Sequence, residues 1–335
     1  MSVEYTVYKG SEDGTIVEAR TRRDAPKSTE VLLKITHSGI CGTDEHYIHK
    51  DMGLGHEGIG IVQKIGDAVS KVKVGDIVGW GYTHKTCGRC DSCLRGRDQY
   101  CINKEEYGSH NFHQGSYGTH AIWEEDFLFK IPSLLEPETA APLMCAGATV
   151  FGIIEAYNVR PTDRVGVIGM GGLGHLAIQF LAKMGCATVV FSGTNAKKAE
   201  AMELGATEFV VTRGVEKFEG VEPVDHLIIT TSLTLNLRPY LSVLKPEAKI
   251  YPTTVTDDDL PVPIMLLIVR GISIQGTAIA NRAIYNRMLD FAARNNIRAI
   301  VERFPMTLSG VREGMRKLRE GNMRYRGVLV ADLSP

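Results

Sequence analysis

The chain has 335 residues, a length that predicts about two domains. Its 38 Lys and Arg residues nearly balance 39 Asp and Glu residues, and the formal charge of −1 disfavours nucleic-acid binding and attraction to anionic membranes. Hydrophobic residues make up 44% and charged residues 23%, a mix that excludes intrinsic disorder, collagen and coiled coil. The first ten residues contain an acid and no apolar run, so no signal peptide is predicted and we expect a cytoplasmic protein.

The first part of the chain, to about residue 135, is predicted to be rich in β-strand. Three short apolar runs, at 31–35, 58–62 and 76–80, have the length and composition of strands. Gly-Asp pairs mark turns between two of them, and glycine is frequent throughout. We therefore expect a β-rich domain here.

Four cysteines lie close together in the spacing C-x2-C-x2-C-x7-C: Cys87, Cys90, Cys93 and Cys101. Four thiolates at short spacing are typical of a closed, tetrahedral structural zinc site. An iron–sulfur site would place the fourth cysteine closer and follow it with proline, whereas Ile102 follows here. A disulfide framework is disfavoured without an export signal. Reduced surface thiols are the remaining alternative.

From about residue 146 to 276 the pattern alternates between strand and helix. The alternation begins with a strand at 165–168, a helix at 173–184 and a strand at 188–191, which predicts a doubly wound parallel sheet. The uncharged stretch 165–182 has the length of a membrane span, but its glycines fit a strand, a tight turn and a helix instead. Further elements are expected at 196–204, 208–211, 226–230, 237–244, 249–251 and 272–275, followed by helices around 285–295 and 308–320 and a strand at 327–331.

A glycine-rich turn follows the strand at 165–168. It has the pattern G-x-G-G-x-G, formed by Gly169, Gly171, Gly172, Leu173 and Gly174. Between a strand and a helix, such a turn lets the backbone approach a pyrophosphate that sits on the helix N-terminus. We interpret it as a dinucleotide site; the alternative is a tight turn without a ligand.

The second strand of this unit bears on the choice of dinucleotide. An NAD enzyme places an acid about 20 residues after the glycine turn, to bind the ribose hydroxyls. Residues 186–199 contain no acid, and they include Ser192, Thr194, Lys197 and Lys198. This composition suits a 2′-phosphate and predicts NADP(H). The alternative for the two lysines is a solvated first turn of helix.

Two further cysteines, Cys41 and Cys145, flank the segment Gly55-His56-Glu57. Two thiolates and one imidazole form the three-ligand set of a catalytic zinc whose fourth position is open. On spacing alone the indication is weak, because a cysteine in an apolar segment such as that around Cys145 is more often part of the core.

These motifs occur in the order found in a known family. Cys41-Gly42-Thr43-Asp44, Gly55-His56-Glu57-Gly58, the four-cysteine segment, Cys145 and the glycine turn together resemble the zinc-containing medium-chain alcohol dehydrogenases. Within that family the chain looks most like the cinnamyl alcohol dehydrogenase-like branch, with support from residues 140–147 and 324–327. The resemblance implies a GroES-like catalytic domain at 1–146, completed by 277–335, a Rossmann NADP-binding domain at 147–276, and a homodimer or homotetramer.

The resemblance also implies roles for individual residues. Cys41, His56 and Cys145 would hold the catalytic zinc, with Glu57 as a fourth or transient ligand. Asp44 would accept a hydrogen bond from the other ring nitrogen of His56, as is usual for a ligating histidine.

Two neighbouring residues would carry the proton of the substrate. Thr43 would hydrogen-bond the substrate oxygen, and His46 would pass its proton to solvent, since imidazole titrates near physiological pH. Taken alone, Thr43 is an ordinary turn residue, Asp44 a capping acid and His46 a solvated histidine.

The chain departs from the family pattern between Cys41 and His56, where only fourteen residues lie. The shorter connection implies either a more open substrate cleft or a trimmed surface loop. Three residues precede the four-cysteine segment: Trp80, Tyr82 and Thr83. In one interpretation they line the substrate pocket. In the other, Trp80 and Tyr82 are aromatic residues of the core.

The leading prediction is a zinc-dependent oxidoreductase that transfers a hydride between NADP(H) and an alcohol/aldehyde pair, primary and aromatic or aliphatic. One alternative is an NADPH-dependent reductase of a conjugated C=C bond or an iminium; another is a non-catalytic nucleotide-binding structural protein. The complete set of ligand and relay residues disfavours both alternatives. A polyol dehydrogenase is less expected, because the third ligand is cysteine and the NAD acid is absent.

Overall fold

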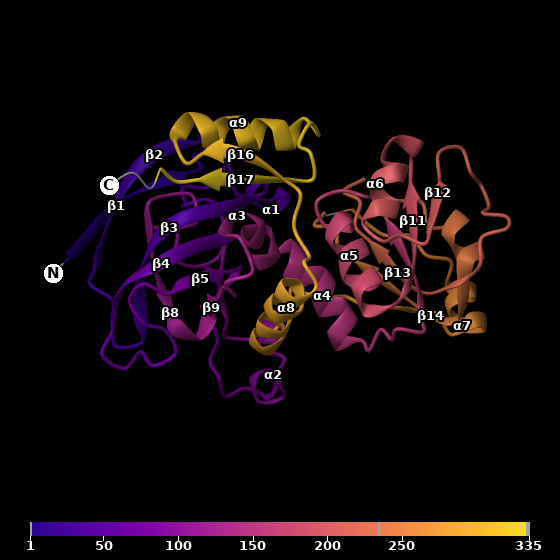
Figure 1. The fold of residues 1–335 in the computed structure, drawn as a ribbon, viewed down its shortest axis with the longest axis horizontal. Helices are drawn as coiled ribbons and strands as arrows, with labels where there is room; N and C mark the ends of the chain where they lie inside the picture. The colour runs from indigo at the N-terminus through magenta and orange to yellow at the C-terminus, as the bar shows by residue number, and fades with distance from the viewer. Residues whose placement is uncertain (1, 234, 257, 333–335) are drawn as a thin grey trace. The chain divides into compact units, whose positions relative to one another are not determined.

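The structure is a computed structural model that describes residues 2–233, 235–256 and 258–332. The chain forms two compact units, one of Met1–Ala148 with Ile279–Pro335 and one of Thr149–Ala278 (Figure 1). The first unit is thus built from both ends of the chain, and the second is inserted between them.

The first unit contains a seven-stranded sheet. Its strands run in the order β16 (Val301–Pro305), β17 (Arg326–Val330), β3 (Glu30–Ile40), β4 (Gly58–Ile65), β5 (Ile77–Trp80) and β9 (Phe129–Lys130), with β8 (His120–Glu124) also paired to β3. The strands predicted at 31–35, 58–62, 76–80 and 327–331 are confirmed. The antiparallel pairing of β17 with β3 sets Gly327 opposite Ile40, so the end of the chain completes the sheet beside Cys41.

The first unit also contains two helices that the sequence predicts. α9 (Leu308–Arg319) lies along β16 and β17 and places Val311 and Met315 in the core (Figure 1). It begins at Thr307, whose side chain accepts a hydrogen bond from the Gly310 amide as an N-cap. α8 (Arg282–Arg294) starts three residues earlier than the sequence pattern predicts, and its N-cap Asn281 accepts a hydrogen bond from the Ile284 amide.

The second unit is a six-stranded sheet in which all pairings are parallel. The strand order is β12 (Glu208–Val211), β11 (Ala187–Ser192), β10 (Arg164–Ile168), β13 (Val224–Ile229), β14 (Leu244–Pro252) and β15 (Ser273–Ile274). In chain order this is 3-2-1-4-5-6, the arrangement of a Rossmann fold, so the doubly wound prediction is confirmed. The order reverses beside β10, where ligands of such sheets bind at the carboxyl ends of the strands.

The remaining elements are short, apart from the paired strands β1 and β2 and the helices α4 and α5. They are β1 (Ser2–Lys9), β2 (Val17–Asp24), α1 (Gly42–Glu45), β6 (Thr83–Lys85), α2 (Asp91–Leu94), β7 (Glu105–Glu106), α3 (Pro137–Ala140), α4 (Ala146–Ala156), α5 (Gly174–Met184), α6 (Lys198–Glu203), α7 (Ile264–Arg270) and five 3-10 turns. The segment expected at 237–244 forms one such turn, Pro239–Val243. Among the described residues no single helix is long and apolar enough to cross a membrane; one pair bent by 58°, Pro137–Met144 with Ala146–Ala156, meets the test of length and composition.

Candidate active site

Four metal-binding side chains from separate segments meet in the first unit. Their ligand atoms all lie within 4.8 Å of one another, and they belong to Cys41, His56, Glu57 and Cys145. Cys41 follows β3, and Cys145 lies between a 3-10 turn and α4. His56 and Glu57 directly precede β4, so the adjacent ends of β3 and β4 bring Cys41, His56 and Glu57 together, and the segment between the 3-10 turn and α4 adds Cys145.

The His56 ring is oriented for a metal ion. Its side chain is fully buried, and its Nδ1 lies 2.9 Å from a carboxylate oxygen of Asp44. Its Nε2 has no hydrogen-bond partner within the described part of the chain. A buried ring nitrogen without a partner is costly, and a cation among these donors would satisfy it. The residues present therefore fit zinc.

The two thiols of the site influence each other. The hydrogen bond from Cys145 lowers the pKa of Cys41 well below its usual value, and His56 acts in the same direction against the effect of burial. The same contact and burial raise the pKa of Cys145. A bound dication favours the thiolate form of both groups.

Glu57 is held by a residue from the other end of the chain. Both of its carboxylate oxygens accept hydrogen bonds from the Arg326 guanidinium, and both side chains are buried. Burial raises the pKa of Glu57 to about 8, and the Arg326 charge opposes that rise. The pair needs a glycine at position 39, because a Cβ there would lie 1.8 Å from Glu57 Oε2. No local pattern in the sequence indicates the contact between Glu57 and Arg326, which are 269 positions apart.

The predicted relay residues lie on or next to α1, directly after Cys41. Thr43 is half-buried and His46 is exposed at the end of the helix, an arrangement in which one can contact substrate and the other solvent. The short connection between Cys41 and His56 packs into the core through Met52 and Leu54.

The two aromatic residues before the four-cysteine segment have different environments. Trp80 is fully buried, and its ring lies 5.6 Å from that of Trp123 in the core. Tyr82 is half-buried, its ring is edge-on to His56 at 5.5 Å, and its hydroxyl lies 2.9 Å from that of Tyr47. Tyr82 is thus beside the candidate metal site, whereas Trp80 is a core residue.

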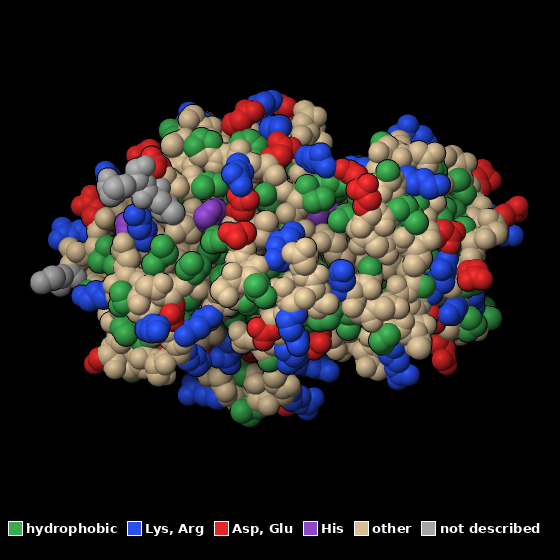
Figure 2. Space-filling view, viewed as in Figure 1, with side chains coloured by type: hydrophobic (Ala, Val, Ile, Leu, Met, Phe, Trp, Pro, Cys, Tyr) green, Lys and Arg blue, Asp and Glu red, His purple; other side chains and the backbone are tan. Residues whose placement is uncertain are grey.

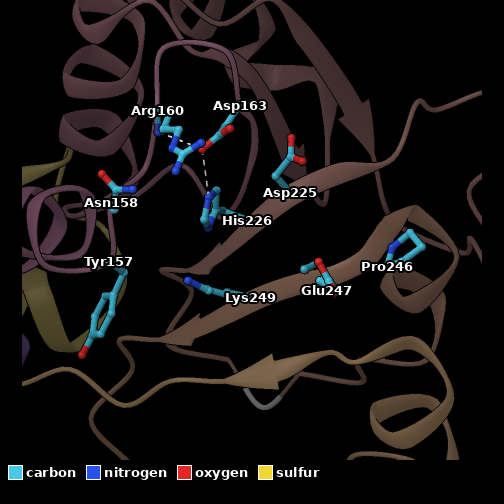
Figure 3. Close-up of a pocket in the computed structure, with 10 residues that line it drawn as sticks. Tyr157, Asn158, Arg160, Asp163, Asp225, His226, Pro246, Glu247 and Lys249 are labelled. Atoms are coloured by element: carbon cyan, nitrogen blue, oxygen red, sulfur yellow. Dashed lines mark hydrogen bonds and ion pairs between the residues drawn. The ribbon is translucent and has the colours of Figure 1, made fainter.

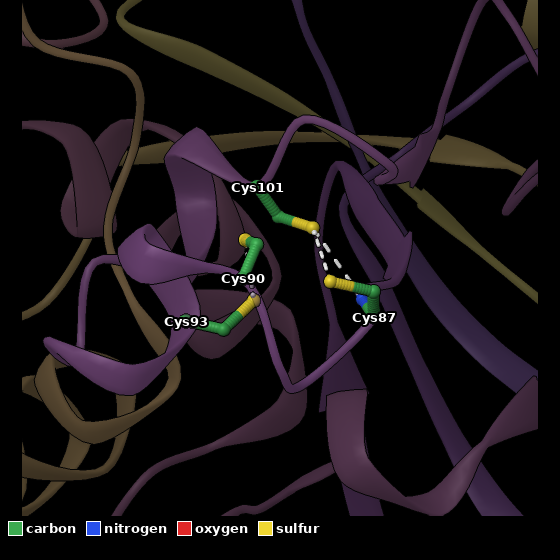
Figure 4. A group of neighbouring side chains, drawn as sticks. All are labelled: Cys87, Cys90, Cys93 and Cys101. Atoms are coloured by element: carbon green, nitrogen blue, oxygen red, sulfur yellow. Dashed lines mark hydrogen bonds between the residues drawn. The ribbon is translucent and has the colours of Figure 1, made fainter.

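The four-cysteine segment forms a second cluster (Figure 4). The Sγ atoms of Cys87 and Cys101 are 3.5 Å apart, and those of Cys90 and Cys93 are 3.6 Å apart. All four are free thiols, and their sulfur atoms lie within 4.8 Å of one another. This arrangement fits a closed structural zinc site.

The segment 87–101, which we call the lobe, has few apolar contacts of its own. Leu94 is 75% exposed, and Figure 2 shows Lys and Arg side chains around the position of α2. An ion pair connects the lobe to α8: Asp98 Oδ2 lies 2.7 Å from Arg282 Nε. A metal ion is therefore the main candidate for ordering it.

The predicted glycine turn joins β10 to α5 in the second unit. Gly169 has φ +91°, which favours glycine, and a Cβ on Gly174 would lie 2.0 Å from the carbonyl oxygen of Gly169. Around Gly171 there is open space, so its backbone is free to approach a ligand. Gly172 and Leu173 complete the turn, and Leu173 is the N-cap of α5.

The predicted 2′-phosphate residues follow β11. Ser192 ends this strand and is half-buried, while Thr194 is exposed. Lys197 Nζ donates a hydrogen bond to the Met170 carbonyl at 3.0 Å, which brings this lysine next to the glycine turn. The ammonium group of Lys197 therefore lies beside the glycine turn. An NAD enzyme would instead have an acidic side chain near the end of its second strand.

A cavity of about 280 Å³ lies at the amino ends of the strands of the same sheet, opposite the ends that carry the glycine turn (Figure 3). It is lined by residues at the amino ends of β10, β13 and β14. Within it the His226 ring pairs with Asp163 and with the Tyr251 hydroxyl, each at 3.1 Å. Burial lowers the pKa of His226, and Asp163 opposes that effect. Because both ring nitrogens are paired, we assign this histidine a structural role.

The chain belongs to the zinc-containing medium-chain alcohol dehydrogenase family. Residues 27–133 match the family model described as alcohol dehydrogenase GroES-like domain, and residues 172–294 match that of zinc-binding dehydrogenase. The family prediction and the resemblance to the cinnamyl alcohol dehydrogenase-like branch are thereby confirmed.

Particular relatives cover nearly the whole chain. Cinnamyl alcohol dehydrogenase 8 of Arabidopsis thaliana is 33% identical over 324 residues, covering 92% of this chain and 89% of the relative. Mannitol dehydrogenase of Apium graveolens is 33% identical over 331 residues, covering 94% and 90%. Among solved structures, the cinnamyl alcohol dehydrogenase of Helicobacter pylori complexed with NADP(H) has a TM-score of 0.88 at 25% identity and covers 98% of this chain and 99% of that one.

Proposed function

We propose that this alcohol dehydrogenase-family oxidoreductase uses NADP(H) and interconverts primary, aromatic or aliphatic, alcohols and aldehydes. The observation that carries the proposal is the donor set of the buried Cys41 and His56 and the half-buried Cys145, with an Nε2 on His56 that has no hydrogen-bond partner among the described residues. Three protein ligands leave a fourth position for substrate. Zinc bound there supplies Lewis acidity that lowers the pKa of an alcohol hydroxyl.

Asp44, Thr43 and His46 would each have a different role around that ion. Asp44 accepts the Nδ1 hydrogen of His56, which leaves Nε2 free to bind. Thr43 accepts the proton of the substrate hydroxyl and passes on its own, because a hydroxyl both donates and accepts. His46, exposed at the end of α1, delivers that proton to solvent.

The cofactor preference is expected to depend on Ser192. In Ser192→Asp a carboxylate would stand where the 2′-phosphate is proposed to bind, and like charges about 4 Å apart repel by about 1–4 kcal/mol, or roughly 5- to 1000-fold. We expect the ratio of kcat/KM for NADPH to that for NADH to fall by this factor. Ser192→Ala, which removes a hydroxyl but adds no charge, should lower the ratio much less than Ser192→Asp does. Equal use of NADH by the unmodified enzyme would contradict the proposal.

We propose two zinc ions per chain, and the lobe ion is expected to stabilise the fold. Cys90→Ser should remove one zinc by elemental analysis and lower the melting temperature by several degrees, since each kcal/mol lost lowers Tm by roughly 2–4 °C in a domain of about 200 residues. Ser92→Ala, in the same lobe, is the control and should keep two zinc ions and an unchanged melting temperature. Two zinc ions and an unchanged Tm in Cys90→Ser would disprove a structural metal.

Self-association and a cytoplasmic location are also proposals. α7 exposes four apolar side chains, those of Ile264, Met265, Ile268 and Val269, next to the edge strand β15. Exposed apolar patches of this kind mark protein–protein contacts, which supports a homo-oligomer. Sedimentation equilibrium tests the first proposal, and cell fractionation tests the second.

A further inference from the structure

Four hydrogen bonds converge on the buried Asp44 carboxylate. Its Oδ1 accepts from His56 Nδ1 and from the Tyr107 hydroxyl, both at 2.9 Å. Its Oδ2 accepts from the Tyr117 hydroxyl at 2.8 Å and from the Cys41 amide at 3.0 Å. Asp44 is fully buried, and these four donors occupy about all the lone-pair positions that a carboxylate offers.

The Tyr107 hydroxyl serves a second group as well. It accepts a hydrogen bond from the Gly55 amide at 3.0 Å, so it links the residue before His56 to the carboxylate behind the His56 ring. The rings of Tyr107 and His56 lie 4.9 Å apart. One tyrosine therefore contacts both the backbone of Gly55, just before this candidate ligand, and the ring of the ligand itself.

Tyr117 fixes the same turn from another side. Gly55 has φ +89°, and a Cβ on it would lie 2.3 Å from Tyr117 Cδ1. The turn that carries His56 thus packs directly against the Tyr117 ring, while the Tyr117 hydroxyl holds Asp44. Both phenols are fully buried, and neither contact needs an ionised tyrosine.

We infer that Tyr107 and Tyr117 are positioning residues, whose hydroxyls lock Asp44 so that His56 presents an unprotonated Nε2 to the metal. With either hydroxyl removed, one carboxylate oxygen loses a donor and the carboxylate can turn away from His56. Loss of such outer partners typically weakens metal binding by roughly 10–100-fold. The inference rests on the proposed zinc at Cys41, His56 and Cys145.

The test compares Tyr107→Phe and Tyr117→Phe with a matched control, Tyr8→Phe. Tyr8 is also buried, but its hydroxyl donates to the Met306 main-chain carbonyl at 3.2 Å. Zinc release to a chromogenic chelator is followed in the holoenzyme. We expect one of the two zinc ions to leave roughly 10–100-fold faster in the two test variants only. The lobe zinc, held by four other cysteines, should leave at an unchanged rate in all of them.

A second readout uses the metal-free protein. At an alkaline pH, where the ring is neutral, imidazole ¹⁵N NMR is expected to show His56 protonated at Nδ1 in the unmodified protein and in Tyr8→Phe, and a mixture of tautomers in the test variants. Unchanged release and an unchanged tautomer in both test variants would overturn the inference, as would equal effects in Tyr8→Phe. Absence of zinc from Cys41 and Cys145 in the unmodified enzyme would contradict the proposed function instead, and the NMR comparison would still decide the role of the two tyrosines.

Discussion

Replacing Cys145 with serine is expected to abolish alcohol oxidation while the fold is retained. A neutral hydroxyl is a much poorer zinc ligand than a thiolate, so the variant would keep only two strong donors, Cys41 and His56, from the set of three. The Lewis acidity lost is worth several kcal/mol, and the expected fall in kcat/KM is on the order of 10³-fold or more. Elemental analysis should find one zinc in place of two.

The neighbouring residues explain why the fold should survive. Leu143 and Met144 are fully buried before Cys145, and the exchange of sulfur for oxygen leaves their packing in place. The control is Cys186→Ser in the second unit, where the thiol donates to the Arg160 carbonyl. That variant should keep both zinc ions and its activity. Full activity in Cys145→Ser would disprove the proposed ligand set.

Removing the Thr43 hydroxyl is expected to give the second largest effect. Thr43→Ala takes away the group proposed to accept the substrate proton, and general-base steps of this kind contribute roughly 10²–10⁴-fold. Alanine suits the short helix α1, so the loss should appear in kcat with little change in Tm. Thr43→Ser keeps the hydroxyl and should be mild.

A pH–rate profile separates the relay from simple packing. His46→Ala should slow oxidation less than Thr43→Ala and mainly at lower pH, because water can replace an exposed histidine but hydroxide is then scarce. Equal, pH-independent losses in the two variants would mean that both residues act only in packing. Full activity in Thr43→Ala would reject the proton relay and favour reduction of a conjugated double bond.

Local patterns predicted most of the two sheets. The run that forms β10, the glycine turn and α5 is predictable because an apolar strand, four closely spaced glycines and an apolar helix follow one another between residues 164 and 184. β1 and β2 were missed, since β2 carries charged residues and pairs along its whole length only with β1. β16 was missed as well; it is a five-residue edge strand, and only one of its residues is buried.

The candidate site was less accessible to sequence reasoning. Cys41, His56 and Cys145 could be proposed because their side chains have few common uses other than metal binding or burial in the core. Arg326, Tyr107 and Tyr117 contact the site from 63 to 269 positions away along the chain, and no motif marks them for that role. For Arg326, the resemblance of residues 324–327 to the family is a signal, but it does not indicate a contact with Glu57.

We propose that the Cys41, His56 and Cys145 site reduces a carbonyl group with NADPH and leaves a conjugated C=C bond untouched. The most direct measurement is the product formed from an aromatic enal, such as cinnamaldehyde, with NADPH and the zinc-loaded enzyme. We expect the allylic alcohol, with its C=C bond intact, and no turnover by Cys145→Ser. A saturated aldehyde as product, or the same rate with Cys145→Ser, would contradict it.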